Sequence, residues 1–515
     1  MDAVTPNPDP DLCRSLADDL RGAGFTSEAV RSGWGEAADD AVVRGLRGPA
    51  LRGLAGRDDA VAVLSRLFVL GMPQPAADVA RALSRTGVEG LETLGLVETV
   101  AAGGGDPDAR PLALIRPQSF SDARGDGEWW IASDLDETAL GGPLPEDHVL
   151  GVGGASLTLA AIQLPTPAER ALDVGSGCGI QSLRARRAVS RVVATDISDR
   201  ALSYTRLNAL LNGVDGVEIR RGSLFEPVRG ETFDRIVSNP PFVITPRRDD
   251  VPEYEYRDGG MVGDDLVAAF VTGAGEHLAP GGIAQLLANW ETRDGTPGLD
   301  RVRGWVEASA APLDAWIVER ESLDPLAYAE LWVRDGGTVP GTPAFARLID
   351  AWLDDFASRG VTEIGFGYVL LRRPADGAPT LARYERVAQA VPDQAGLGEH
   401  LAAALAAHDR LSRLDDAGVA ASVFTVAPDV TEARHHRPGE ADPTVIELRQ
   451  GGGFGRTLSV DPALAALVGA CDGDLPAGVL IDAIAELLDA DASVSRKDML
   501  PKVRELVFAG FLTFT

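Results

Sequence analysis

A short run near the middle of the chain, SNPPF (residues 238–242), carries residue types that suit chemistry on a planar nitrogen. The side-chain oxygen of Asn239 and the carbonyl of Pro240 can each accept one N–H, which turns the nitrogen lone pair towards an electrophile. Pro240 and Pro241 stiffen this backbone. Phe242 offers a flat face for stacking. We therefore expect Asn239, Pro240, Pro241 and Phe242 to be the catalytic residues.

A second set of residues, upstream, indicates a pocket for a nucleotide-type cofactor. The run ALDVGSGCGI (171–180) predicts a buried strand that ends at Asp173, a glycine turn and the start of a helix. The next strand, RVVATD, ends in Asp196, where a doubly wound fold places the acid that holds ribose hydroxyls. The turn has the spacing G-x-G-x-G and not the dinucleotide spacing G-x-G-x-x-G. This spacing favours S-adenosyl-L-methionine, which has no pyrophosphate, over a dinucleotide.

Both sets of residues need a sheet to position them, and the chain predicts seven strands in order. The last of the seven is long and antiparallel, and a helical insertion, AFARLIDAWLDDFASRG (344–360), precedes it. Before the first strand, the glycine-rich stretch 148–164 opens a helix at about Ser156 and could close over a cofactor. The predicted strands are RALDV, RVVATD, VEIRR, FDRIVS, GGIAQLLANW (281–290), LDAWIVE (313–319) and VTEIGFGYVLLRR (361–373).

From about residue 149 to residue 373 the chain resembles the class I S-adenosylmethionine-dependent methyltransferases, which have a Rossmann-like α/β sheet of seven strands. The resemblance implies that Asp173 and the glycine turn border the methionine part of the cofactor, that Asp196 takes the ribose, and that Ser223 and Leu224 flank the adenine. The family often has an acid where Ser223 stands. The implied cofactor-binding residues are Asp173, Gly175, Ser176, Gly177, Gly179, Asp196, Ile197, Ser223, Leu224 and Asn239.

The NPPF motif after the fourth strand resembles that of methyltransferases acting on planar nitrogens. These include adenine- and guanine-specific nucleic-acid enzymes and the release-factor glutamine methyltransferases of the HemK family. YEYRDGGMVGDDLVAAF (254–270) resembles the GG-x-DGL segment of HemK-like enzymes through Gly259, Gly260, Gly263 and Asp264. The resemblance favours an N-methyltransferase for a protein glutamine amide, with a base of rRNA, tRNA or DNA as the alternative. A non-catalytic adaptor that binds the cofactor is a third hypothesis.

The flanking segments predict further domains, since 515 residues are too many for one hydrophobic core. We expect an N-terminal helical, winged-helix-like domain (1–110), a β-rich connector (111–147), the methyltransferase domain (148–375) and a C-terminal α+β domain (376–515). The C-terminal domain should begin with a helix at LARYERVAQAV and end in a second winged-helix-like module. Its VRELVFAGFLT (503–513) echoes VEGLETLGLVE (88–98). Simple packing domains are the alternative.

Composition limits the partners. The formal net charge of −29 opposes binding to a phosphate backbone unless basic residues gather locally. Three distant cysteines and six mostly scattered histidines predict no metal site. The absence of an apolar run of spanning length or a signal pattern predicts a cytoplasmic protein with no membrane partner. The expected partner is a protein substrate, such as a translation factor or ribosomal component, or RNA; the oligomeric state stays open.

Overall fold

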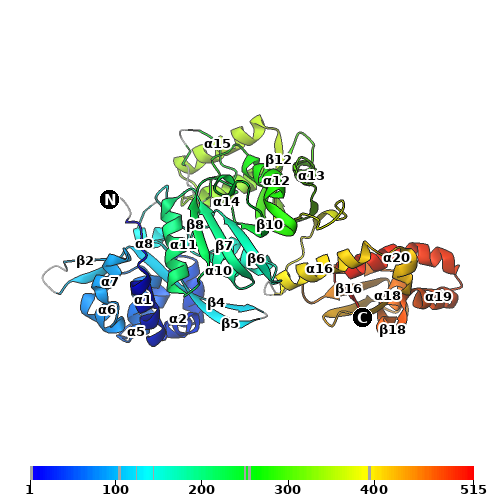
Figure 1. The fold of residues 1–515 in the computed structure, drawn as a ribbon, viewed down its shortest axis with the longest axis horizontal. Coiled ribbons are helices and arrows are strands. Elements are labelled where there is room, and N and C mark those ends of the chain that lie inside the picture. The colour runs from blue at the N-terminus through cyan, green and yellow to red at the C-terminus, as the bar shows by residue number, and fades with distance from the viewer. Residues whose placement is uncertain are drawn as a thin grey trace. The chain divides into compact units, whose positions relative to one another are not determined.

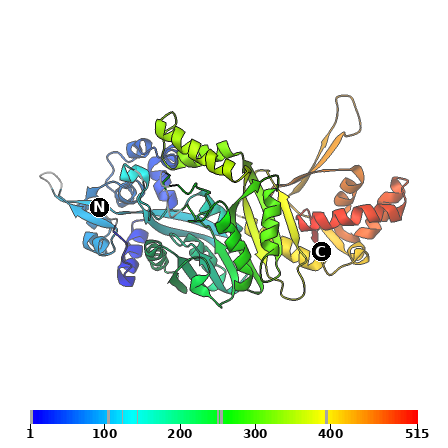
Figure 2. The ribbon, with the colours of Figure 1, turned by 90° about the horizontal axis from the view of Figure 1, so that it is seen from above.

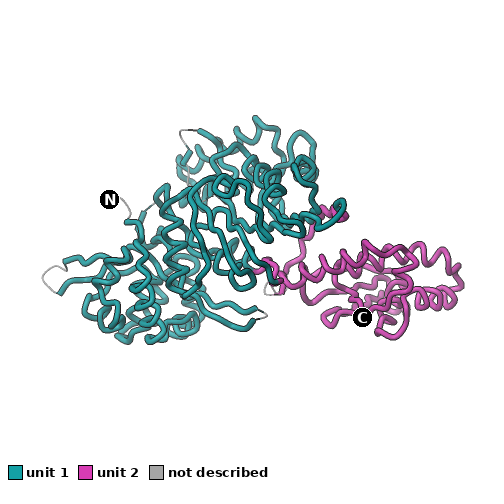
Figure 3. Tube along the Cα trace, in the orientation of Figure 1, with its two compact units in different colours: residues 1–160, 167–379 teal, residues 161–166, 380–515 magenta. Residues whose placement is uncertain are grey.

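The computed structural model describes residues 4–101, 106–122, 124–142, 144–248, 251–252, 257–391 and 396–515. Figure 1 and Figure 2 show the chain in two views. Its contacts divide it into two compact units, which Figure 3 distinguishes by colour. Unit 1 consists of residues 1–160 and 167–379, and unit 2 consists of residues 161–166 and 380–515.

Unit 1 contains a central sheet that holds the predicted motifs. Seven of its strands lie in the order β8-β7-β6-β9-β10-β12-β11. The neighbouring pairs from β8 to β10 are parallel, and β12 runs antiparallel to both β10 and β11. Each strand coincides with a predicted one, and the antiparallel strand is the one expected. Their bounds are β6 Ala168–Val174, β7 Val189–Asp196, β8 Val217–Arg221, β9 Phe233–Ser238, β10 Leu278–Arg293, β11 Asp314–Leu323 and β12 Val361–Arg372.

Helices pack on this sheet. α10 (Ile180–Arg186) contacts β6 and β7, and α11 (Asp199–Leu211) contacts β7 and β8. α12 (Asp265–His277) and α13 (Gly298–Glu307) contact β10. The insertion before the antiparallel strand contains two helices that contact β12, α14 (Pro325–Asp335) and α15 (Pro343–Ser358). The sequence predicted α15 but not α14, whose start is capped by Asp324.

The N-terminal part of unit 1 is a helical array followed by small sheets. The predicted β-rich connector contains a hairpin, in which β4 (Ala113–Asp122) pairs with β5 (Gly125–Asp134). The helix expected near Ser156 is α9 (Gly154–Ile162). The other elements are α1 Pro10–Gly22, α2 Ser27–Trp34, α3 Glu36–Val43, α4 Gly48–Gly53, α5 Ala60–Leu64, the π-helix η1 Ser65–Val69, β1 Gln74–Pro75, α6 Ala76–Ala82, α7 Gly87–Thr93, β2 Val97–Val100, β3 Asp108–Pro111 and α8 Glu137–Leu140.

One predicted helix of unit 2 is a strand in the structure. The segment LARYERV was expected to be helical, but Ala382–Arg386 form strand β13. Arg383 and Glu385 are two residues apart and form an ion pair of 3.1 Å, and Glu385 also receives Arg456 at 2.6 Å. Side chains two residues apart lie on one face of a strand, so these contacts favour a strand locally over a helix. The remaining elements are α16 Leu397–Leu411, α17 Asp416–Ala421, β14 Val423–Val426, β15 Val430–His435, β16 Val445–Gln450, β17 Thr457–Val460, α18 Pro462–Ala470, β18 Asp472–Pro476, α19 Ala477–Leu487, α20 Ala492–Phe508 and β19 Leu512–Phe514.

Two three-stranded sheets, one in each unit, have the same local architecture. In unit 1 the order is β1-β3-β2, and in unit 2 it is β18-β14-β19. In each, a helix leads into the first strand, two helices follow it, and a further strand comes after them. The middle strand differs in origin, because β3 follows the others in the chain whereas β14 precedes them. The second sheet is therefore a circular permutation of the first.

Matching hydrogen bonds support this equivalence. The amide of Ala76, which begins α6, donates to Pro107 O at 2.9 Å, and the amide of Ala477, which begins α19, donates to Ser422 O at 2.9 Å. The turns after the third helix also match. Gly95 and Gly510 have positive φ (72° and 79°), and the amides that follow them donate five residues back, to Leu91 O and Leu506 O. The two modules therefore share the arrangement of helices, strands and turns around their sheets.

Candidate functional site

The glycine turn after β6 keeps a space open at the carboxyl edge of the sheet. Gly175, Gly177 and Gly179 all have positive φ (72°, 54° and 82°), which L side chains rarely adopt. The amide of Gly175 donates to Thr195 O at 2.8 Å, which ties the turn to the next strand. A Cβ at Gly175 or Gly177 would meet no atom within 4 Å. Contacts within the protein therefore do not explain the absence of a side chain at these two positions. A ligand that approaches the backbone there would explain it.

Asp173, in β6, is fully buried beside this turn. Its Oδ2 accepts a hydrogen bond from the Ser182 hydroxyl at 2.7 Å, and its Oδ1 is buried with no hydrogen-bond partner among the described residues. Burial raises the pKa of the Asp173 carboxyl to about 7; the Ser182 hydrogen bond opposes this rise and the nearby Asp196 adds to it. A buried acid with an unused oxygen is prepared for a cationic or hydrogen-bond-donating ligand.

Asp196 ends β7 and faces the same turn. Its Oδ2 accepts the Gly177 amide and its Oδ1 accepts the Ser198 amide, both at 3.0 Å. Burial raises the pKa of the Asp196 carboxyl, while these backbone hydrogen bonds lower it. The neighbouring Ile197 leaves half of its side chain exposed (50%). The structure thus brings Asp173, the glycine turn and Asp196 together, as the sequence predicted.

The turn after β8 closes the same edge. The amide of Gly222 donates to Asp196 O at 2.9 Å, so the predicted pair Ser223 and Leu224 begins next to the end of β7. Ser223 is exposed. Leu224 has φ 46°, a strained conformation that only two other non-glycine residues of the described chain adopt. Strained backbone of this kind is concentrated at functional sites.

The four predicted catalytic residues, Asn239, Pro240, Pro241 and Phe242, which we call the clamp, follow the end of β9. The Ser238 hydroxyl donates to Val174 O at 2.8 Å, which aligns the end of this strand with β6. The side-chain nitrogen of Asn239 donates to the Ser156 hydroxyl of α9 at 3.4 Å. Its Oδ1 is buried and has no hydrogen-bond partner within the described ranges. Asn239 therefore keeps an unused acceptor at the end of β9, and α9 helps to fix its amide.

The stretch after Asn239 is held by residues that the sequence did not predict. Phe242 forms a β-bridge with Asp258, and its ring packs against an apolar cluster built by the helical insertion and β12. The Tyr328 hydroxyl, on α14, accepts the Ile244 amide at 3.0 Å and the Asn289 side-chain amide at 2.8 Å. Tyr328 is fully buried, and burial raises the pKa of its hydroxyl. The insertion therefore fixes the backbone next to the clamp.

The glycine-rich segment after the clamp packs directly on it. A Cβ on Gly259 would lie 2.9 Å from Pro241 O, so only glycine fits there. Gly263 has φ 59°, and a Cβ on it would approach Arg293 and Arg359 to 2.5 and 2.6 Å. The start of the predicted segment, residues 254–256, lies outside the described residues. Gly259 and Gly263 therefore have a structural reason in the packing of this loop.

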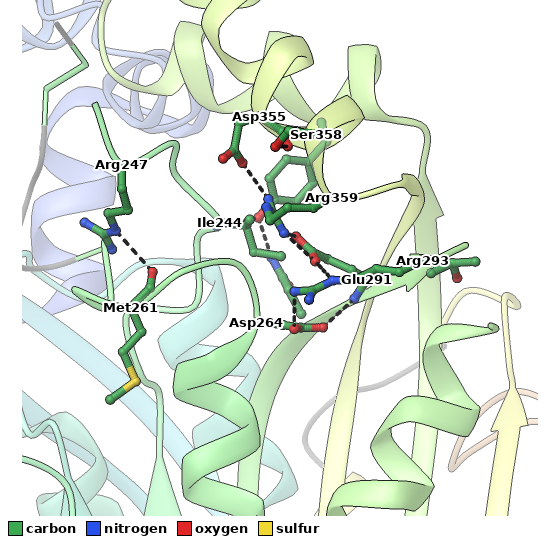
Figure 4. A network of polar contacts seen from close by, with 12 residues as sticks. Ile244, Arg247, Met261, Asp264, Glu291, Arg293, Asp355, Ser358 and Arg359 are labelled. Atoms are coloured by element: carbon green, nitrogen blue, oxygen red, sulfur yellow. Dashed lines mark hydrogen bonds and ion pairs between the residues drawn. The ribbon is translucent and has the colours of Figure 1, made fainter. Parts of the chain in front are cut away.

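A buried ionic network supports the same segment (Figure 4). Asp264 accepts the Glu291 amide at 2.9 Å, Arg293 at 2.8 Å and Arg301 at 2.6 Å. Glu291 is fully buried on β10 and receives Arg293 and Arg359. Burying charges costs free energy unless they are paired, and here every acid is paired. The network joins the start of α12, β10 and the end of α15 around the clamp.

No group of three or more His, Cys, Asp or Glu in the described ranges is placed to hold a metal ion. Cys13, Cys178 and Cys471 are free and buried. Among the described helices, none is long and apolar enough to span a membrane.

The strand order, the glycine turn and the two carboxylates define an α/β fold that binds a nucleotide-type cofactor at its carboxyl edge. Comparisons with known proteins identify the class further. Residues 153–302 match the methyltransferase small domain family. Residues 22–108 and 404–514 match two families described as domains of unknown function, DUF7059 and DUF7782.

Three relatives illustrate the likeness. A release factor glutamine methyltransferase of Deinococcus radiodurans is 33% identical over 266 residues, covering 48% of this chain and 91% of the relative. A release factor glutamine methyltransferase of Geobacter sulfurreducens is 39% identical over 118 residues (22% of this chain, 41% of the relative). A ribosomal protein uL3 glutamine methyltransferase of Bradyrhizobium diazoefficiens is 34% identical over 151 residues (27% and 46%). The chain thus spans less than half the length of the last two.

The chain belongs to the HemK-like family of class I S-adenosylmethionine-dependent methyltransferases. The cofactor of this family is S-adenosyl-L-methionine, and the open glycine turn and the unused Asp173 oxygen fit such a ligand.

Proposed function

We propose that this protein transfers a methyl group from S-adenosyl-L-methionine to the side-chain amide nitrogen of a glutamine in a protein. The observation that carries the proposal is the buried, unused Oδ1 of Asn239 at the carboxyl end of β9. An amide nitrogen is a weak nucleophile because its lone pair is delocalised. An acceptor that takes one N–H orients the nitrogen and favours the pyramidal form in which the lone pair is available.

In the proposed reaction the residues of the clamp orient the substrate amide. Asn239 Oδ1 and the Pro240 carbonyl accept the two amide hydrogens, and Ser156 keeps the Asn239 amide oriented. The cofactor supplies an electrophilic methyl group on its sulfonium. The glutamine nitrogen forms the new bond to carbon as the carbon–sulfur bond breaks, and one amide proton leaves to water. Pro241 and Phe242 fix the loop, Phe242 through its packing on the insertion.

The pocket residues would hold the cofactor around this centre. We assign Asp173 and the turn Gly175, Ser176, Gly177 and Gly179 to its methionine part. We assign the ribose to Asp196 and Ile197 and the adenine to Ser223 and Leu224. Asp196 already accepts two backbone amides, so a ribose hydroxyl would use a remaining lone pair of its oxygens.

The rim of the site favours a protein substrate. Leu157 follows Ser156 on α9 and is 41% exposed, and Met261 and Val262 follow the glycines that touch the clamp and are 39% and 48% exposed. Such apolar side chains suit the residues that flank a glutamine in a protein loop. The formal net charge of −29 opposes a nucleic-acid backbone. The relatives' names, release factor and uL3 glutamine methyltransferase, point to a translation protein. We propose that the reaction takes place in the cytoplasm.

Methylation of an RNA or DNA base is the second candidate, favoured by Arg247 and Arg248 on the loop after the clamp. Arg247 donates to Met261 O at 3.1 Å (Figure 4), which leaves its guanidinium near the rim. A flipped base would present an exocyclic amine to the same acceptors.

We further propose that the permuted modules are winged-helix-like and present the substrate. Their support is the shared order of helices and strands and the matching hydrogen bonds. The division into 1–110, 111–147, 148–375 and 376–515 belongs to this proposal.

Labelling with a tritiated cofactor tests the function. Lysate from a strain lacking the protein is incubated with the pure protein and separated into protein, rRNA, tRNA and DNA. We expect label in protein, on glutamine, and none with Asn239→Ala, which should still bind the cofactor. Label in a nucleic-acid fraction would establish the second candidate. No label in any fraction would favour a non-catalytic adaptor.

A further inference from the structure

Unit 2 carries the densest group of exposed large apolar side chains in the described chain. Five of the eighteen such residues lie between positions 475 and 494, on and beside helix α19. Leu487 is 84% exposed and Val494 66%. The five residues are Leu475, Val479, Leu487, Leu488 and Val494. Isolated exposed apolar residues need no explanation, but a contiguous group of them indicates an interaction surface.

On the outer face of α19, exposed apolar residues are regularly spaced along the helix. Val479, Ala483 and Leu487 are exposed and four residues apart, so they form one row along the helix. The opposite face is apolar too, and its Leu480, Ile481, Ile484 and Ala485 are buried in the core of unit 2. A helix that only packs on its own core is polar outside. The outer row of α19 therefore has no role in the packing of unit 2.

The other module provides an internal control. Because α6 begins at Ala76 where α19 begins at Ala477, Val79 corresponds to Leu480 and Leu83 to Ile484. All four of these residues are buried and apolar. The outer position of Val479 is Asp78 in α6, and Asp78 forms an ion pair of 2.9 Å with Arg81. The fold of this module thus tolerates a charged residue at this position, so an apolar residue such as Val479 is not needed there for folding.

The surroundings of the row are acidic. Asp482 lies on α19 beside this row and forms an ion pair with Arg496. Further exposed acids lie before the helix, near its end and after it. Arg496 and Lys497 are the exposed basic residues of the first turns of α20. The exposed acids around α19 are Asp472, Asp474, Glu486, Asp489 and Asp491. This excess of negative charge repels nucleic-acid phosphates and anionic lipid, and it attracts a cationic partner.

We propose that the α19 surface, formed by Leu475, Val479, Ala483, Leu487 and the acids around them, docks a cationic amphipathic helix of a partner protein. A row of residues four apart is a ridge that fits a groove of another helix. Apolar side chains of the partner cover Val479 and Leu487, and its Lys and Arg side chains meet the acidic rim. This docking is separate from the proposed methyl transfer and holds whatever the substrate is.

The experiment measures binding of a fluorescent peptide to the full-length protein by anisotropy. The peptide is an amphipathic helix of about five turns, with Leu on one face and Lys on the other. We expect micromolar binding, weakened about tenfold or more by Val479→Asp and by Leu487→Asp. Since these variants add negative charge, attraction by charge alone would strengthen binding of the cationic peptide. The direction of the change thus separates docking from nonspecific attraction.

Two controls complete the test. Val43→Asp changes a residue of unit 1 that is 86% exposed, and it should leave the affinity unchanged. A peptide of the same composition in scrambled order should bind weakly. Unchanged or tighter binding by Val479→Asp, or equal binding of the scrambled peptide, would overturn the proposal. So would a dimer of the free protein that Val479→Asp dissolves, because the occupant would then be a second copy.

Discussion

A single buried carboxyl, that of Asp173, should link cofactor affinity to pH. Its pKa in the free protein is raised to about 7, chiefly by burial, and its Oδ1 has no partner in the described chain. The ionised form is the one that attracts the cationic part of the cofactor. Binding therefore requires loss of a proton below pH 7, and the affinity should fall about tenfold for each pH unit below that value.

Titration calorimetry at several pH values between about 5.5 and 8.5 checks this dependence. We expect Asp173→Asn to bind weakly with a flat profile. Because the folded pKa lies above the ordinary value of 3.8, the carboxyl's favourable contribution to stability is lost as the pH rises through about 7. Asp173→Asn should therefore be at least as stable as the natural protein at pH 8. A flat profile in the natural protein would contradict the role given to Asp173.

The glycine turn allows a matched pair of substitutions. Gly175 and Gly213 have similar positive φ (72° and 62°), and a Cβ on either would meet no atom within 4 Å. Alanine at either position should cost about 1 to 2 kcal/mol of stability through backbone strain. Only Gly175→Ala should also weaken cofactor binding, by about tenfold or more, because its Cβ would occupy the open space at the pocket. Equal affinities of the two variants would remove the turn from the cofactor site.

At the scale of elements, the helical insertion controls the clamp through one hydroxyl. Tyr328→Phe would keep the ring in its aromatic cluster but leave the amides of Ile244 and Asn289 without their acceptor. We expect turnover to fall about tenfold or more while cofactor affinity stays the same, since the pocket lies on other strands. The Ile244 amide should exchange its hydrogen faster.

The matched control for this prediction is Tyr368→Phe on β12, whose ring lies 6.0 Å from the Arg320 guanidinium. It removes a tyrosine hydroxyl from the same domain and should leave turnover unchanged. If Tyr328→Phe lowered cofactor affinity as much as turnover, the hydroxyl would support the whole domain and not the clamp in particular.

The pocket and clamp could be predicted because their signals are local in the sequence. Asp173 lies near the end of β6, the glycine turn follows this strand and Asn239 follows β9, and the apolar pattern of each strand reveals it in the sequence. Tyr328 could not be found this way, because its partner Ile244 is 84 residues away and no spacing rule connects them. The same limit applies to Trp129 and Trp130. Strand alternation places these two adjacent residues on opposite faces of β5, and both faces are buried.

At the scale of the whole chain, the repeated module was only partly visible in the sequence. The echo between residues 88–98 and 503–513 marks the third helix and the strand after it, which occupy equivalent places. The other correspondences could not be detected in the sequence for two reasons. β1 has only two residues, and the middle strand comes last in the chain in unit 1 but first in unit 2. The hydrogen bonds, and not the residue types, reveal the permutation.

Helix α9 begins in unit 1, and its last residues, from Ala161 on, belong by their contacts to unit 2. It carries Ser156, which holds Asn239, and its end belongs with residues 161–166 to unit 2. That segment packs so closely on α16 that a Cβ at Gly398 would lie 2.4 Å from Gln163 O. Gly398→Ala should push the end of α9 away and so loosen the Asn239 amide. Turnover should fall about tenfold while cofactor affinity changes little.

Gly396→Ala is the matched control, two residues earlier at the start of the same helix, where a Cβ would meet nothing within 4 Å. It should leave turnover unchanged. Both variants should keep unit 2 folded, because its core, formed mainly by α18, α19 and α20, is not altered. The measurement is methyl transfer to the labelled fraction, together with thermal unfolding. Equal turnover of the two variants would mean that the packing of Gly398 on residues 161–166 has no effect on Asn239, whereas a loss confined to Gly398→Ala would show that it has one.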